Sequence, residues 1–123
     1  MNNDRAKFKN DFKRRIYCFV LDLIKFIDGL PRDSVCKIIS NQLLRSGTSV
    51  LANYVEAQAA SSKKDFTNFF HHALKSANES LMWLTLLRDL NKGDKEKIAY
   101  LLGELTEIAK ILASSILTLK GKK

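Results

Sequence analysis

The sequence predicts an all-α protein, an antiparallel up-down-up-down four-helix bundle. Only one Pro and five Gly occur in 123 residues, so few positions force a long helix to stop. Apolar residues also recur at intervals of three and four along most of the chain, which is the repeat of an amphipathic helix. The length and the hydrophobic content of 46% suit one domain with one core, residues 1–123.

The first helix is expected over about residues 4–28, and two helix breakers follow it. Gly29 accepts the left-handed conformation that closes a helix, and Pro31 cannot donate a backbone hydrogen bond. An apolar seam on this helix should pack against neighbouring helices. The seam repeats at steps of four and three residues: Phe8, Phe12, Ile16, Phe19, Leu23, Phe26 and Leu30.

Three further helices are expected over about residues 34–59, 63–90 and 94–119. Each follows or begins with a residue whose side chain can accept hydrogen bonds from free backbone N–H groups: Asp33 or Ser34, then Ser62, then Asp94. Only two or three residues connect the second helix to the third, so these two helices must be antiparallel neighbours. The other connections are also short, which extends the same rule to the whole bundle.

The second helix has two faces, and both carry a pattern. One face is apolar, with Leu43, Val50 and Tyr54. The other is a stripe of mostly small or uncharged polar residues at helical spacing: Gln42, Arg45, Ser46, Ser49, Asn53 and Glu56. Two interpretations are open. The stripe could line a partly solvated groove in the monomer, or it could form a subunit interface or buried polar network. Partners for a network would come from Ser76, Glu79 or Trp83 of the third helix or from another subunit, because an unpaired buried polar group costs about 1–3 kcal/mol.

The chain is strongly basic, with 21 Lys and Arg against 13 Asp and Glu and a formal charge of +8. Such an excess favours RNA or DNA, because basic residues release the counterions of a phosphate backbone. An ordinary solvated helix face and a partner with an acidic surface are the alternatives. No base-reading motif accompanies the charge, so little sequence preference is expected. The candidate phosphate-binding residues lie in two clusters: Arg5, Lys7, Lys9, Lys13, Arg14 and Arg15, and then Lys63 and Lys64.

The sequence lacks the motifs of the common catalytic and cofactor sites. His71 and His72 are adjacent rather than spaced for a shared metal ion on a helix, and all five glycines are isolated. No GxSxG elbow is present, and neither Cys has a neighbouring base. We therefore expect no catalytic residues, no metal ion and no cofactor.

Cys18 and Cys36 are 18 residues apart without a metal-binding spacing, and we expect two buried free thiols rather than a disulfide. The charged N-terminus does not resemble a signal peptide. The longest apolar candidate for a membrane span is interrupted by Asp22 and Lys25. We expect a soluble cytoplasmic protein without a membrane partner.

Several runs of the sequence resemble the signature of the small bacterial four helix bundle proteins, also known as the 23S rRNA intervening-sequence-encoded family. The resemblance extends over nearly the whole chain, and its central motif is specific. Its elements fall on Gln42, Leu43, Arg45 and Ser46; on Ser49, Asn53 and Glu56; on Ser62, Lys63, Lys64, Asp65 and Phe66; and on Ala73, Ser76 and Glu79.

The resemblance implies a four-helix bundle that assembles as a homopentamer, encoded by genes sometimes found inside rRNA intervening sequences. It also implies a relation to the accessory variability proteins of diversity-generating retroelements, which bind a reverse transcriptase and nucleic acid. We accordingly expect a non-enzymatic, basic, oligomeric bundle that binds the backbone of RNA or DNA. The alternative is a protein-interaction scaffold or an accessory subunit, for example of a reverse transcriptase, without direct nucleic-acid binding.

Overall fold

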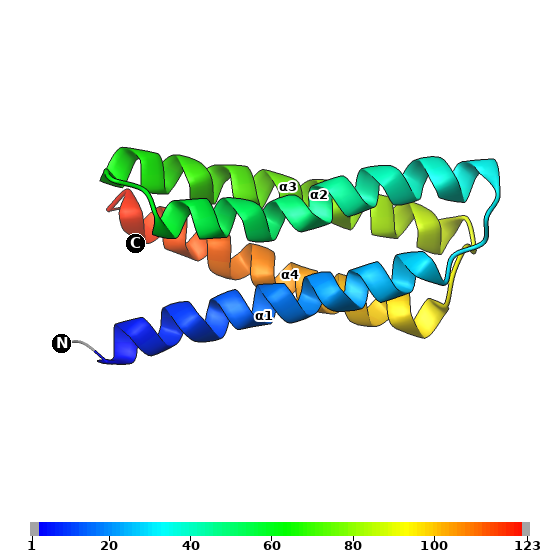
Figure 1. The fold of residues 1–123 in the computed structure, drawn as a ribbon, viewed down its shortest axis with the longest axis horizontal. Coiled ribbons are helices and arrows are strands. Elements are labelled where there is room, and N and C mark those ends of the chain that lie inside the picture. Colours follow the sequence, from blue (N-terminus) through cyan, green and yellow to red (C-terminus); the bar gives the residue numbers. More distant parts are fainter. Residues whose placement is uncertain (1–2, 122–123) are drawn as a thin grey trace.

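The chain folds into four long helices, as Figure 1 shows for the computed structural model. The structure describes residues 3–121, apart from the side chains of residues 3–6, 8 and 9. The helices are α1 (Asn3–Asp28), α2 (Ser34–Gln58), α3 (Lys63–Asp89) and α4 (Lys95–Leu119). They run alternately up and down, so α1 and α3 begin at the end of the molecule where α2 and α4 finish (Figure 1). The predicted fold class, an all-α four-helix bundle, is confirmed.

Three side chains fix where the helices start. Asp33 accepts a 2.8 Å hydrogen bond from the backbone N–H of Cys36 and caps α2. Ser62 and Asp94 cap α3 and α4 in the same way, at 3.1 and 3.0 Å. Asp94 is therefore the residue before α4 rather than its first helical residue. The α3–α4 turn needs left-handed backbone, which Asn91 and Gly93 adopt with φ of 56° and 86°.

Each helix packs on its two neighbours around a single core. The α2–α3 contact is the most extensive, and the α1–α4 contact is the least. Gly47 of α2 allows α1 to approach closely, because a Cβ at this position would overlap the buried side chain of Leu23. Leu30 lies beyond the end of α1 yet is only 7% exposed, so the apolar seam of α1 continues into the connection.

The two cysteines differ in their environments. Cys36 is fully buried, and this burial raises the pKa of its thiol. Cys18 is exposed, so the expectation that both thiols are buried is wrong for this residue. The reason is helical geometry: Cys18 precedes the fully buried Leu23 by five residues, which places it about 140° around α1 from the core. Both thiols are free.

None of the helices, within the residues described, combines the length and apolar character that crossing a bilayer requires.

Candidate functional site

The α2–α3 interface has a buried pair of hydroxyl groups at its centre. The Oγ atoms of Ser46 and Ser80 lie 2.7 Å apart in a hydrogen bond, and the two residues are 1% and 0% exposed. Ser80 also donates to the carbonyl of Ser76 at 2.9 Å, and Ser46 can donate to the carbonyl of Leu43 at 3.3 Å. Every buried hydroxyl in this group therefore has a partner, which removes the cost of placing it in the core.

A second polar group lies farther along the same interface. Ser76 of α3 donates a 3.0 Å hydrogen bond to Ser49 of α2. The Asn53 amide turns back along its own helix and donates to both the carbonyl and the hydroxyl of Ser49, at 2.9 Å each. These short side chains satisfy one another, so the two helices can pack closely without an apolar layer between them.

The outer edge of the interface carries a charged group. Arg45 donates to Gln42 at 2.9 Å and to the carboxylate of Glu79 at 3.1 Å. The indole N–H of Trp83 donates to the same oxygen of Glu79, also at 3.1 Å. Arg45 has a side chain that is 66% exposed, so this ion pair faces solvent and contributes little to stability. Glu56, the last residue of the predicted stripe, is exposed and lies outside the network.

The predicted polar stripe is therefore brought together with α3 of the same chain. Ser76 and Glu79 contribute to this network from α3. Sequence reasoning missed Ser80, although it follows Ser76 by one helical turn and so shares its face. The network has no arrangement of nucleophile and base, and its chemistry is that of a helix–helix contact.

The two basic clusters both begin at one end of the bundle, where α1 and α3 start (Figure 1). Lys63 and Lys64 lie at this end, whereas the cluster on α1 extends to the middle of that helix, where Lys13, Arg14 and Arg15 lie. Lys7, Lys13, Arg14, Lys63 and Lys64 are all exposed, and none of them forms an ion pair with another described residue. The side chains of the other two candidates on α1 lie outside the described part: Arg5 and Lys9.

Arg15 differs from the other basic candidates because it is already paired. Its guanidinium donates two hydrogen bonds to the carboxylate of Glu104 on α4, at 2.7 and 3.0 Å. This bidentate contact, joining residues 89 positions apart, raises the pKa of Arg15. Arg15 therefore ties α1 to α4 and is less available to a phosphate than its neighbour Arg14.

Among the described residues, no three His, Cys, Asp or Glu side chains gather as the ligands of a metal ion would. His71 and His72 are both exposed on α3, and the ring of His72 lies 6.5 Å from that of Phe69.

The fold and the interface define an all-α bundle in which hydrogen bonds between hydroxyl groups join α2 to α3. Exposed basic residues lie along the first half of α1 and at the start of α3. The chain belongs to the family of 23S rRNA-intervening sequence proteins, which it matches over residues 9–114. It is similar to a protein of unknown function from the S23 ribosomal protein family of Bacteroides thetaiotaomicron VPI-5482, known from a crystal structure. The two are 36% identical with a TM-score of 0.80, and the match covers 85% of this chain and 97% of the other. None of the curated proteins matches the chain.

Proposed function

We propose that this protein is a non-enzymatic, homo-oligomeric bundle that binds the phosphate backbone of RNA or DNA. The observation behind this proposal is a set of exposed cations that form no ion pair with another described residue, at the start of α3 and along the first half of α1: Lys63, Lys64, Lys7, Lys13 and Arg14. Cations without a carboxylate partner remain free to replace the counterions of a phosphate backbone.

The start of α3 adds to the attraction for a phosphate. Lys63 and Lys64 occupy the first helical turn, where backbone N–H groups lack partners within the helix and the helix dipole is positive. Ser62 satisfies one of these groups by accepting from the N–H of Asp65, and the side chain of Asp65 partly offsets the local charge. The lysines, rather than the helix end alone, therefore provide most of the expected attraction.

RNA is the first nucleic acid to test, because the family to which the chain belongs is named after the intervening sequences of 23S rRNA. Self-association would strengthen the effect, since each further copy adds a formal charge of +8 to the assembly. A homopentamer is the assembly that the family resemblance implies. Light scattering on the purified protein measures the subunit number, and a mass of 14.0 kDa would contradict self-association.

The test of nucleic-acid binding is a filter-binding titration across salt concentrations, using single-stranded and duplex RNA and DNA of unrelated sequence. Backbone binding predicts a logarithm of affinity that falls linearly with the logarithm of salt concentration. If the protein contacts only the backbone, it should also bind unrelated sequences with similar affinities. Absence of binding at low salt, or binding that salt does not weaken, would overturn the proposal.

A second candidate function is a protein-interaction scaffold, and exposed apolar side chains favour it. On α2, Ile38 is 65% exposed and Val35 is 47% exposed. Leu86 on α3 is 39% exposed, and Leu90, the residue directly after α3, is 47% exposed. α2 and α3 are antiparallel, so all four lie toward the same end of this hairpin, opposite the basic end. The family resemblance names a reverse transcriptase as the kind of partner.

A pull-down with and without nuclease separates the two functions. A reverse transcriptase that is retained after nuclease treatment contacts the protein directly, whereas one bridged by nucleic acid is lost. A cytoplasmic location is part of both proposals, and the free thiols of Cys18 and Cys36 are those of a reducing compartment.

A further inference from the structure

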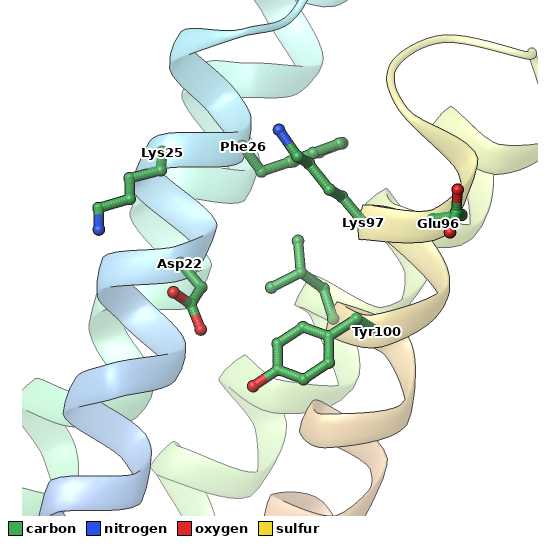
Figure 2. A pocket seen from close by; sticks show the side chains of 7 residues that line it. Asp22, Lys25, Phe26, Glu96, Lys97 and Tyr100 are labelled. Carbon is green, nitrogen blue, oxygen red and sulfur yellow. The ribbon is translucent and has the colours of Figure 1, made fainter.

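A pocket lies between the second half of α1 and the start of α4, away from the α2–α3 network. It has a volume of about 390 Å³, at the lower end of the range of small-ligand sites. Phe26 and Leu101 form its apolar lining and are almost fully buried. The ring of Tyr100 projects from α4 beside them and is 58% exposed, so one side of the pocket is an uncovered aromatic surface (Figure 2).

Charged groups border this apolar pocket. Figure 2 shows the carboxylate of Asp22 and the hydroxyl of Tyr100 extending into the space between the two helices. Lys97 extends from α4 toward Phe26, while Lys25 extends along the outer side of α1. Glu96 is the second acidic residue of the lining, and its carboxylate lies on the side of α4 away from α1. Partial burial, together with the charges of Asp22 and Glu104, raises the pKa of Tyr100. The hydroxyl group of Tyr100 can donate a hydrogen bond to a ligand.

We infer that this pocket holds one unpaired guanine base of a single-stranded nucleic acid bound along α1. The base would stack on Tyr100 and contact Phe26, and the carboxylate of Asp22 would accept hydrogen bonds from the ring N–H and the amino group of guanine. Lys97 would bind the adjoining phosphate. This inference rests on the proposed function and adds a local base preference to backbone binding.

The charges at the rim favour a nucleotide over an apolar side chain from a partner protein. An apolar side chain would cover Asp22 and Lys97 without offering either a hydrogen bond, which is costly for charged groups. A nucleotide offers donors to the carboxylate and an anion to the ammonium group. Guanine has two adjacent donors for a carboxylate, whereas the one donor of uracil lies between two carbonyl oxygens that would repel it.

A line of cations connects the basic end of the bundle to this pocket. Lys7, Arg14 and Lys25 are separated by seven and eleven residues, so they lie on one stripe of α1. All three are exposed, and the stripe is about 27 Å long at 1.5 Å per residue. A single strand following this stripe would reach the pocket mouth at Lys25, which combines a basic track with an aromatic stacking surface.

The test compares two short oligouridylates of equal length, one of them with a single central guanosine, by fluorescence anisotropy at low salt. We expect the guanosine strand to bind about tenfold more tightly, because the Asp22 carboxylate can pair with the two donors of guanine but not with uracil. Asp22→Asn should remove most of this preference. Tyr100→Ala should reduce it by removing the surface on which the base is held, and Tyr100→Phe should keep most of it. Tyr17→Ala is the matched control, because Tyr17 is a similarly exposed tyrosine of α1 outside the pocket.

Each result decides between distinct conclusions. Equal affinity of the two strands, or an unchanged preference for guanosine in the folded Tyr100→Ala variant, would overturn the guanine site. If both strands still bind in a salt-dependent way, the proposed function is not affected by this result. Failure of both strands to bind overturns the proposed function and the site together. Sedimentation could also show that the Tyr100→Ala variant forms a smaller assembly while its RNA binding is unchanged. The pocket would then be a contact between copies of the chain, and the guanine site would be overturned. Circular dichroism checks that each variant is folded.

Discussion

Ser46 of α2 and Ser80 of α3 share a 2.7 Å hydrogen bond at a place where both side chains are almost completely buried. In most helical bundles this position would hold apolar side chains that interlock. Two hydroxyl groups here let the helices come close together while requiring that α2 and α3 align in one register. A shift of either helix would separate the pair and leave two buried hydroxyl groups without each other.

Replacement of these serines tests how strongly they are coupled. Ser46→Ala and Ser80→Ala should each lower the free energy of unfolding by about 1 kcal/mol, the usual contribution of one hydrogen bond. The double variant should lose less than the sum by about 0.5 kcal/mol or more, because the second change has no shared bond left to break. Urea denaturation of the three variants measures this difference, and strictly additive losses would contradict it.

Gly47 and Gly103 provide a matched pair of helical glycines. Gly47→Ala should lower stability by about 1 kcal/mol or more, since the new Cβ overlaps the buried side chain of Leu23 and overpacking outweighs the gain in helix propensity. Gly103→Ala should raise stability by about 0.5–1 kcal/mol, because no atom lies within 4 Å of the added Cβ. Thermal melting compares the two, and stabilisation by both changes would show that α1 can move away from Gly47.

Asp33 should make stability depend on acidity. Its pKa lies below its ordinary value of 3.8, first because it accepts from the backbone N–H of Cys36 and then because Lys92 bonds to it at 3.0 Å. A group with a lowered pKa stabilises the fold above its unfolded pKa, and this contribution is lost as pH falls through the folded pKa.

The comparison for this prediction is Asp33→Asn, which can still cap α2 but does not titrate. The melting temperature of the natural chain should exceed that of the variant near neutral pH. The difference should shrink as pH falls through 3.8, the ordinary pKa of this carboxyl group, and then through its lowered pKa in the folded protein. A difference that stays constant over this interval would exclude a role for the charge.

Lys63 and Lys64 should contribute to nucleic-acid binding by pairing with phosphates. The double variant Lys63→Ala/Lys64→Ala should weaken binding of unrelated sequences alike and reduce the salt slope by about 1 for each lysine that pairs with a phosphate. Its control is Lys37→Ala/Lys95→Ala, which removes two exposed lysines near the starts of α2 and α4 at the opposite end. An equal loss of affinity in both variants would show that only net charge matters.

Arg14 and Arg15 are neighbours with different expected roles. Arg14→Ala should weaken nucleic-acid binding and leave stability nearly unchanged, because this side chain is exposed and unpaired in the described structure. Arg15→Ala should affect binding less and lower stability by about 1 kcal/mol or less, because it breaks the partly exposed ion pair with Glu104. Filter binding and urea denaturation of the same samples separate the two, and reversed effects would refute this assignment.

The fold class was predictable because apolar spacing and the scarcity of helix breakers act locally. Alternation of the four helices then followed from short connections, and the side chains that cap α2, α3 and α4 were visible in the sequence. Cys18 was placed wrongly because its apolar character was weighed without its angular position on α1.

The candidate site was less predictable because it depends on contacts between distant residues. Helical spacing indicated that Ser49 and Asn53 share a face, but not whether α3 or another subunit would meet them. Arg15 pairs with Glu104 because α1 and α4 turn these two side chains toward each other. This relative rotation cannot be derived from the sequence of either helix by itself. The pocket beside Tyr100 likewise lies between α1 and α4, the neighbouring helices with the least extensive contact, and depends on how these two helices pack.

The contrast between the two cysteines gives the protein one natural attachment point for a reporter dye. A thiol-reactive fluorophore should couple at the accessible Cys18 and spare the inaccessible Cys36 without any engineering of the chain. Cys18 precedes Asp22, which lines the α1–α4 pocket, by four residues, so a dye at Cys18 lies about one helical turn from this opening and can register events there. The natural sequence can thus be labelled with a dye at Cys18 and followed in solution by fluorescence, without substitutions.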